Sequence, residues 1–263
     1  MRAAIIGGTG FDTIEGIHLE PEIIHTAYGD VKVYRGGGEW EDIFFLPRHG
    51  ISHSTPPHRI NYRANIKALH QLGVTHVLAT LAVGSISAHL PPGSLVAVDQ
   101  FLDFTQNREG TFFNGGQEGF AHTLMSYPYC PALRQRMIEI GAKLGVSIVP
   151  KGTYVCTNGP RLETAAEIRM FSILGGDVVG MTGVPEAPLA RELGLHYAAL
   201  AYSINWAAGI EAGKEITFIE EGLEALKKSV LTVFLQTLRS SDFPSCECES
   251  SRLMFHPPEE ERA

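Results

Sequence analysis

The chain has 263 residues, a formal net charge of −8 and a hydrophobic fraction of 44%. This composition excludes a disordered chain, because low hydrophobicity and high net charge are not combined here, and the acidic balance argues against a nucleic-acid partner. No apolar run approaches the ~20 residues that cross a bilayer, and the N-terminus becomes glycine-rich too early for a secretory leader. We therefore expect a cytoplasmic protein without a membrane partner.

Strand and helix patterns alternate along the chain. A short apolar strand is expected over residues 2–6, and alternating residues between 21 and 46 predict antiparallel strands. The further expected strands are 76–82, 95–98, 148–156, 178–181 and 196–204, and the expected helices are 60–72, 131–144, 164–174, 185–193 and 216–238. This order predicts one α/β domain over residues 1–239, with a central mixed β-sheet flanked by helices.

Two segments depart from this alternation. Residues 103–130 have weak periodicity, and a long irregular segment in a compact chain is usually functional. Residues 240–263 form a polar C-terminal extension that we expect to be mobile. The extension contains Cys246 and Cys248, which are interpreted as two free thiols or, alternatively, as a local disulfide. A zinc site would need more ligands than the tail offers.

Small, hydroxyl or amide residues follow several expected strands. They are Thr9, Ala82, Thr182 and Asn205. In open α/β sheets ligands bind beyond the carboxyl ends of strands, and free backbone N–H groups there can hold an oxyanion. The glycines at 7–10 suggest a dinucleotide site only weakly, because the G-x-G-x-x-G spacing is missing and strands follow. Asn205 could alternatively only start a turn.

Basic residues gather in the loop after residue 46. Arg48 and His49, with His53 and His58 nearby, could be metal ligands, but no acidic ligand lies in the loop and an arginine is a poor neighbour for a cation. An arginine fork on a phosphate beside a histidine is better chemistry. The alternative is an arginine paired with a surface carboxylate. Further along, Thr164 or Glu163 could simply cap the helix that follows.

An ordered set of motifs resembles the trimeric purine nucleoside phosphorylase and methylthioadenosine phosphorylase family. The motifs are GGTG at 7–10, PRHG at 47–50, NYRAN at 61–65, TLAVGS at 80–85, TNGPRLET at 157–164, GMTGVPE at 180–186 and SINWAAG at 203–209. The resemblance covers nearly the whole chain. It implies reversible phosphorolysis of a purine nucleoside with inorganic phosphate as co-substrate, without a metal or organic cofactor. It also implies a homotrimer or a dimer of trimers.

The resemblance also implies roles for individual residues. The phosphate would lie among Thr9, Arg48, His49, Ala82 and Thr182. The nucleoside would contact Leu162, Glu163, Met181, Asn205, Trp206, Ala207 and Phe218, together with His122 of a neighbouring subunit at the 5′ end of the sugar. Arg48, His49 and Asn205 would be the catalytic residues.

The residues at two positions indicate which purine base the substrate carries. The adenine-using branch of the family carries serine in the Glu163 position and aspartate in the Asn205 position, and this chain departs from it at both. An ionised Glu163 only accepts hydrogen bonds and suits the N1–H of a 6-oxopurine, while the Asn205 amide can donate to O6 and accept from N7–H. We therefore expect hypoxanthine or guanine as the base, in the branch closest to S-methyl-5′-thioinosine phosphorylase.

The 5′ end of the sugar provides a second clue. Ordinary inosine-cleaving members of the family have a histidine in the Phe218 position, and an aromatic ring there favours a thioether. The alternative is that Phe218 only fills the core of the last helix. Three other functions remain open: a methylthioadenosine phosphorylase, a purine-binding sensor without turnover and, least favoured, a dehydrogenase.

Overall fold

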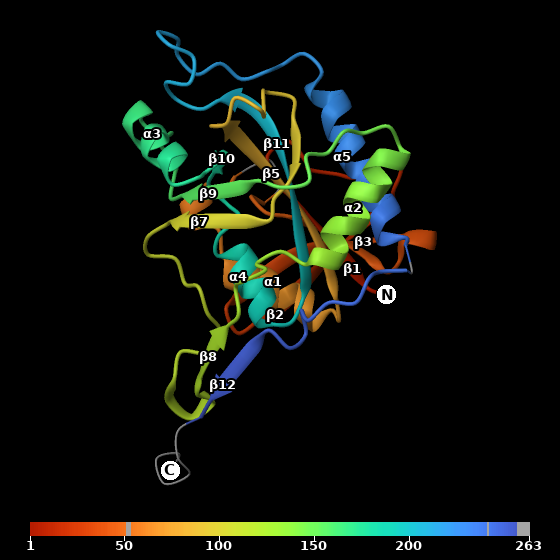
Figure 1. Ribbon diagram of the computed structural model, residues 1–263. Helices are drawn as coiled ribbons and strands as arrows, with labels where there is room; N and C mark the ends of the chain where they lie inside the picture. Colours follow the sequence, from red (N-terminus) through yellow and green to blue (C-terminus); the bar gives the residue numbers. More distant parts are fainter. Residues whose placement is uncertain (51–53, 241, 257–263) are drawn as a thin grey trace.

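The computed structural model describes residues 1–50, 54–240 and 242–256. Its main strands are β1 (Ala3–Gly7), β2 (Leu19–Thr26), β3 (Gly29–Gly36), β4 (Ile43–Pro47), β5 (His76–Ser85), β6 (Leu95–Ala97), β7 (Gln100–Phe104), β9 (Thr153–Thr157), β10 (Val178–Gly180) and β11 (His196–Trp206). Among the described residues these ten strands form one sheet in the order β2-β3-β4-β1-β5-β10-β9-β7, and β11 and β6 continue it beside β5 (Figure 1). The predicted central mixed sheet is confirmed.

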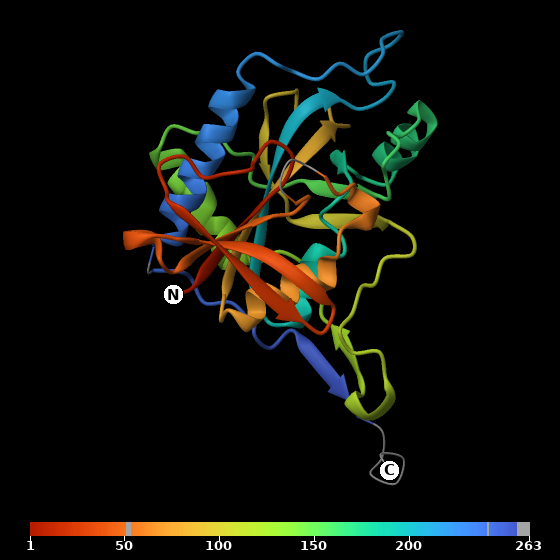
Figure 2. The same ribbon diagram turned by 180° about the vertical axis from the view of Figure 1, so that it is seen from behind.

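The strand directions bring several strand ends to one place. β1 lies between β4 and β5 and runs parallel to both, and β11 runs parallel to β5. β10 is antiparallel to β5 but parallel to β9. The β2–β3 hairpin, red to orange in Figure 2, is antiparallel and extends the sheet on the other side through β4. The segments that follow β1, β4 and β11 therefore lie beside the last residues of β5.

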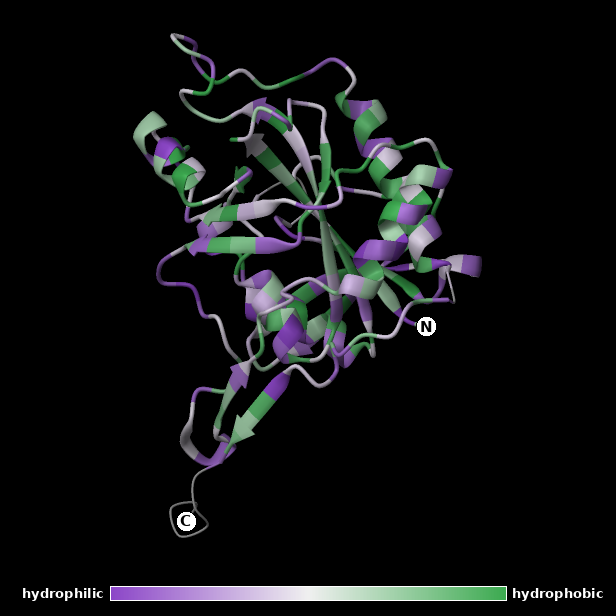
Figure 3. Ribbon diagram, viewed as in Figure 1, coloured by the Kyte–Doolittle hydropathy of each residue, from purple (hydrophilic) through white to green (hydrophobic). Residues whose placement is uncertain are grey.

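Helices cover both faces of the sheet. α1 (Tyr62–Gln71) and α4 (Glu186–Glu192) pack on one face, and α2 (Pro131–Lys143) and α5 (Leu223–Leu238) pack on the other. α3 (Ala165–Ile173) packs beside β9 and β10. In Figure 3, α2 and α5 carry both hydrophobic and hydrophilic residues, as helices with one buried side do. Among the described residues, none of the helices has the length and apolar composition that a membrane span requires.

The last helix begins later than expected. The sequence predicted a helix over 216–238, but α5 begins at Leu223, and residues 207–222 form a loop. Gly222 precedes the helix with φ of 75°, a left-handed conformation that glycine adopts without a Cβ clash. The N–H of Ile219 donates to the carbonyl of Ile204 at 2.7 Å, so this part of the chain bonds to β11 instead of to a helical turn.

Smaller differences concern the strand ends. β5 and β11 extend to Ser85 and Trp206 because these residues pair with each other, beyond the ends expected at 82 and 204. β9 begins at Thr153 instead of 148. Val149 bonds instead to the β6 segment, through its N–H to Leu95 and its carbonyl to Ala97.

Residues 242–256 of the C-terminal extension pack on the domain, contrary to the expectation that this segment is mobile. Cys248 is fully buried and Ser251 is 2% exposed, and the Ser251 hydroxyl donates to the carbonyl of Arg191 at 2.8 Å. Beyond it, β12 (Arg252–Phe255) pairs antiparallel with β8 (Phe120–Thr123) from the irregular 103–130 segment. Figure 1 shows this strand pair projecting from the body of the molecule.

Candidate active site

The strand ends enclose one cavity of about 230 Å³. It is lined by residues from six segments that are far apart in the sequence: Gly8, Thr9, Arg48, His49, Pro57, Ala82, Val83, Gly84, Leu162, Glu163, Val179, Gly180, Met181, Thr182, Ile204, Asn205, Ala207, Ile216 and Phe218. Gly7 pairs with Pro47, and Gly84 pairs with both Val179 and Asn205, so the sheet register itself brings these segments together. The position agrees with the rule that ligands bind beyond strand ends.

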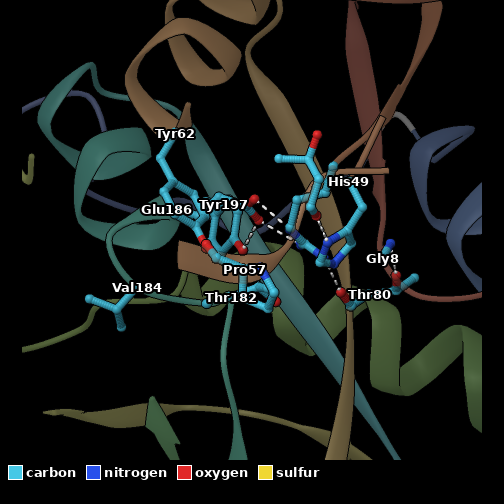
Figure 4. Close-up of polar contacts among 12 residues, drawn as sticks. Gly8, His49, Pro57, Tyr62, Thr80, Thr182, Val184, Glu186 and Tyr197 are labelled. Atoms are coloured by element: carbon cyan, nitrogen blue, oxygen red, sulfur yellow. Dashed lines mark hydrogen bonds and ion pairs between the residues drawn. The ribbon is translucent and has the colours of Figure 1, made fainter. Parts of the chain in front are cut away.

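Arg48, which lines this cavity, belongs to a buried ion pair. Arg48 Nε donates to Glu186 Oε2 at 2.6 Å and Arg48 Nη2 donates to Glu186 Oε1 at 2.7 Å, and both side chains are completely buried. Arg48 Nη1 donates to the carbonyl of Thr80 at 2.9 Å. The hydroxyl of Tyr197 donates to Glu186 Oε1 at 2.7 Å, as Figure 4 shows. Sequence reasoning weighed a carboxylate partner on the surface, whereas the partner lies in the core.

This pairing fixes Arg48 and leaves it donors for a ligand. A guanidinium has five N–H groups, and three are used by Glu186 and Thr80 within the described residues. Burial disfavours the charge, but the attraction and hydrogen bonds of Glu186 raise the pKa of Arg48 above its ordinary value. Gly8 allows the Arg48 guanidinium to lie close to the backbone after β1, because a Cβ on residue 8 would lie only 2.7 Å from Arg48 Nη1. A charged, pre-oriented fork with two N–H groups left suits an oxyanion.

The other residues expected near the phosphate differ in which of their hydrogen-bonding groups are already used within the protein. The backbone N–H groups of Thr182 and Gly183 donate to the hydroxyl of Tyr154 at 3.0 and 3.2 Å, so these N–H groups are already used. The Thr182 hydroxyl makes no hydrogen bond among the described residues, which leaves it for a ligand. His49 Nδ1 donates to the carbonyl of Thr55 at 2.9 Å, and this bond orients the imidazole and places the proton on Nδ1.

The two residues expected to read the base face the same cavity. Glu163 Oε1 accepts a hydrogen bond from Thr157 Oγ1 at 2.5 Å, which holds the carboxylate at the cavity wall. The helix cap that Glu163 could have provided is made by Thr164 and Glu167 instead. Asn205 is 5% exposed, and its Nδ2 donates to the carbonyl of Trp206 at 2.8 Å, which leaves one N–H and Oδ1 for a ligand.

The loop before α5 supplies the apolar wall. Phe218 and Ile216 line the cavity together with Met181 and Leu162. Phe218 is 49% exposed and lies outside the last helix, so the alternative that it fills the core of that helix is wrong.

Four residues singled out in the sequence lie away from this cavity or outside the described part of the chain. Trp206 lines a separate cavity together with residues of the loop before α5. His122 is exposed on β8 in the projecting strand pair and does not line this cavity. His58 is exposed and lines a different cavity, and among the described residues it joins no cluster of metal ligands. His53 lies outside the described residues.

Sequence reasoning missed the residues that support Arg48. Glu186, Thr80 and Tyr197 stood inside quoted motifs or expected elements, but no role was predicted for them. The usable signal was Glu186, an acidic residue next to the apolar run Ala187, Leu189 and Ala190. A carboxylate in a helix turn that is otherwise buried needs a cationic partner.

Comparisons with known proteins agree with this geometry. A model of the phosphorylase superfamily matches residues 2–239, and the chain belongs to this superfamily. It is 52% identical to a probable 6-oxopurine nucleoside phosphorylase of Dictyoglomus turgidum over 80% of each chain, and 49% identical to the 6-oxopurine nucleoside phosphorylase of Pyrococcus furiosus over 83% of this chain and 84% of that one.

Relatives named for another base are also similar. An S-methyl-5′-thioadenosine phosphorylase of Pyrococcus horikoshii is 42% identical over 86% of this chain and 89% of its own. Among solved structures, methylthioadenosine phosphorylase from Schistosoma mansoni in complex with adenine is 33% identical, covers 90% of both chains and superposes with a TM-score of 0.83.

Proposed function

We propose that this protein catalyses the reversible phosphorolysis of 6-oxopurine nucleosides, giving the free purine base and a ribose 1-phosphate. The observation that carries this proposal is one cavity that joins a buried arginine fork to the Glu163 and Asn205 pair. The names of the two relatives at 52% and 49% identity support the same substrate class. The proposed reaction uses inorganic phosphate as co-substrate and no metal or organic cofactor.

The chemistry follows from the two ends of the cavity. Phosphate held by Arg48 and the Thr182 hydroxyl attacks the anomeric carbon as the bond to N9 of the base breaks. The phosphate dianion loses its proton on forming the ester, and the base gains one at N7, so the protons balance. The nearby phosphate anion stabilises the positive charge that develops on the sugar. Asn205 accepts from the new N7–H and donates to O6, which favours departure of the base.

The reaction type is tested by the requirement for phosphate. Inosine and guanosine incubated with the protein should release free base only when inorganic phosphate is present, and ribose 1-phosphate should form in equal amount. Release of base and free ribose without phosphate would show a hydrolase and contradict the proposal. Binding of inosine without any release in phosphate would show a sensor instead.

A specific observation favours a 5′-methylthio group on the sugar. Phe218, Ile216 and Met181 form an apolar wall of the cavity, and none of them can bond a 5′-hydroxyl. An unpaired hydroxyl against this wall costs about 1–3 kcal/mol, and burial of a methylthio group adds about 0.8 kcal/mol per carbon. S-methyl-5′-thioinosine is therefore proposed as a substrate beside inosine and guanosine.

We expect methylthioinosine to exceed inosine in kcat/KM by about 10-fold or more. Phe218→His, which supplies a hydrogen-bonding group, should bring the two values together, whereas Phe218→Leu should keep the difference. The measurement is a parallel phosphorolysis assay of both nucleosides with each variant. Equal wild-type values would show that Phe218 does not read the 5′ group.

We expect the protein to be an oligomer, most simply a homotrimer or a dimer of trimers. The β8–β12 strand pair projects from the body and exposes Phe120 and Phe255, which stack with centroids 5.1 Å apart and flank His122 (Figure 3). Such a projection can carry His122 to the 5′ end of a neighbour's cavity. Light scattering should give three or six chains per particle. A monomer at assay concentration would contradict this expectation.

A further inference from the structure

We propose that Cys130, His196, Cys246 and Cys248 form a structural zinc site that fastens the C-terminal tail to the domain. The four ligand atoms all lie within 4.8 Å of one another. The tail itself offers only two of these ligands, Cys246 and Cys248, as the sequence analysis noted. The missing two come from the start of α2 and the start of β11, which the fold brings beside the tail.

Four of the six distances between the ligand atoms are close to the edges of a tetrahedron around zinc. With Zn–S bonds of ~2.3 Å and Zn–N bonds of ~2.05 Å, tetrahedral geometry separates two sulfurs by about 3.8 Å and a sulfur and a nitrogen by about 3.6 Å. Cys246 Sγ lies 3.6 Å from Cys130 Sγ and 3.6 Å from Cys248 Sγ. His196 Nδ1 lies 3.6 Å from Cys130 Sγ and 3.2 Å from Cys246 Sγ.

The surroundings suit a metal bound by three thiolates and one imidazole. Cys130 caps the N-terminus of α2, and its Sγ accepts a hydrogen bond from the N–H of Leu133 at 3.4 Å, which fixes the position of the sulfur. The other ring nitrogen of His196 lies 3.6 Å from Glu249, and an outer carboxylate of this kind commonly orients a ligating histidine.

The charges around these four residues also favour a bound zinc ion. Zinc with three thiolates and a neutral imidazole has a net charge of −1. Arg191 lines the cavity next to Cys246 and is 5% exposed, and it forms no ion pair with a carboxylate among the described residues. Its Nε has no hydrogen-bond partner within the part of the chain that the structure describes. A buried guanidinium beside an anionic metal centre is compensated, whereas beside neutral thiols it is not.

The site is structural because it lies far from the reacting atoms. His196 begins β11 and Asn205 lies at its other end, nine residues and about 30 Å further along the strand. Four protein ligands close the coordination sphere, as in structural zinc sites, and leave no position for water or substrate. The metal ties three segments far apart in the sequence, which removes freedom from the unfolded chain and stabilises the packed tail.

The test is the metal content of the full chain, purified under reducing conditions without added chelator. Elemental analysis should find about one zinc per chain. Cys248→Ser should lose most of it, and Cys156→Ser, which changes the one cysteine outside the cluster, should keep it. Replacement by Co²⁺ should give thiolate-to-metal charge-transfer bands and the intense visible bands of tetrahedral cobalt. This measurement uses the wild-type chain and does not depend on whether Cys248→Ser folds.

The number of titratable thiols distinguishes a zinc site from a disulfide within the cluster. A zinc site gives four titratable thiols after denaturation, whereas a disulfide within the cluster gives two and no zinc. Two thiols, or four thiols with no zinc after incubation with Zn²⁺ under reducing conditions, would overturn the proposal. Chelation of a genuine site should lower the thermal unfolding midpoint of the wild type and of Cys156→Ser, and leave that of Cys248→Ser unchanged.

Discussion

The double substitution Glu163→Ser with Asn205→Asp is expected to turn the base preference from 6-oxopurines to 6-aminopurines. In the wild type, Glu163 is held at the cavity wall by Thr157 and can only accept a hydrogen bond, so it pairs with N1–H of hypoxanthine. Adenine would present its N1 lone pair to the carboxylate. Where a site is built around one hydrogen bond, such a mismatch gives discrimination of about 10⁴–10⁵. In the double variant the serine hydroxyl can donate to N1, and a protonated aspartic acid can donate to N7 while its other oxygen accepts from the amino group.

The measurement is kcat/KM for inosine, adenosine and their 5′-methylthio analogues with phosphate. Each single substitution serves as a control. It should lose inosine activity without a full gain of adenosine activity, because the unchanged residue, Glu163 or Asn205, still forms hydrogen bonds suited to a 6-oxopurine. The KM for phosphate should stay unchanged, since neither residue belongs to the phosphate end of the cavity. An unchanged base preference in the double variant would contradict the assignment of these two residues.

The substitution Arg48→Ala is expected to abolish most of the turnover and to destabilise the fold. It removes a charge-assisted contact to phosphate worth roughly 1.5–3 kcal/mol, about 10- to 100-fold in kcat/KM for phosphate. It also leaves the Glu186 carboxylate buried without its cation, and breaking a buried pair from one side costs about 3–5 kcal/mol. The thermal unfolding midpoint should therefore fall together with the activity.

Two further substitutions separate the two effects. Thr182→Val removes one hydroxyl at the phosphate end and leaves the ion pair intact, so the phosphate KM should rise about 10-fold with little change in the unfolding midpoint. Glu186→Gln keeps the shape but not the charge, so stability should fall and the phosphate KM should rise because Arg48 is no longer held in place. Wild-type phosphate kinetics in Arg48→Ala would refute the phosphate site.

The sequence could predict the segments that form the cavity because they are local features. Glycine-rich turns and single polar residues after apolar runs mark Thr9, Arg48 and Asn205 without knowledge of the fold, and parallel strands place their ends together. The resemblance added the base-reading role of Glu163. All of these residues line the cavity.

The sequence could not predict contacts that depend on tertiary packing. The partner of Arg48 lies 138 residues away, and nothing local to Glu186 specifies that distance. The late start of α5 follows from a backbone bond between Ile219 and β11, whereas helical spacing of apolar residues continues back to 216. The four potential zinc ligands have no recognisable spacing, because the fold draws two of them from strand and helix starts far from the tail.

The protein phosphorolyses purine nucleosides that carry a 6-oxo group. The most direct measurement is the ratio of kcat/KM for inosine to that for adenosine in the wild-type protein with inorganic phosphate, because the two nucleosides share the same sugar and differ only in the C6 substituent and the N1 proton. The Glu163 and Asn205 pair predicts a ratio of about 10⁴ or more in favour of inosine. A ratio at or below one would contradict this account and assign the cavity to adenine nucleosides.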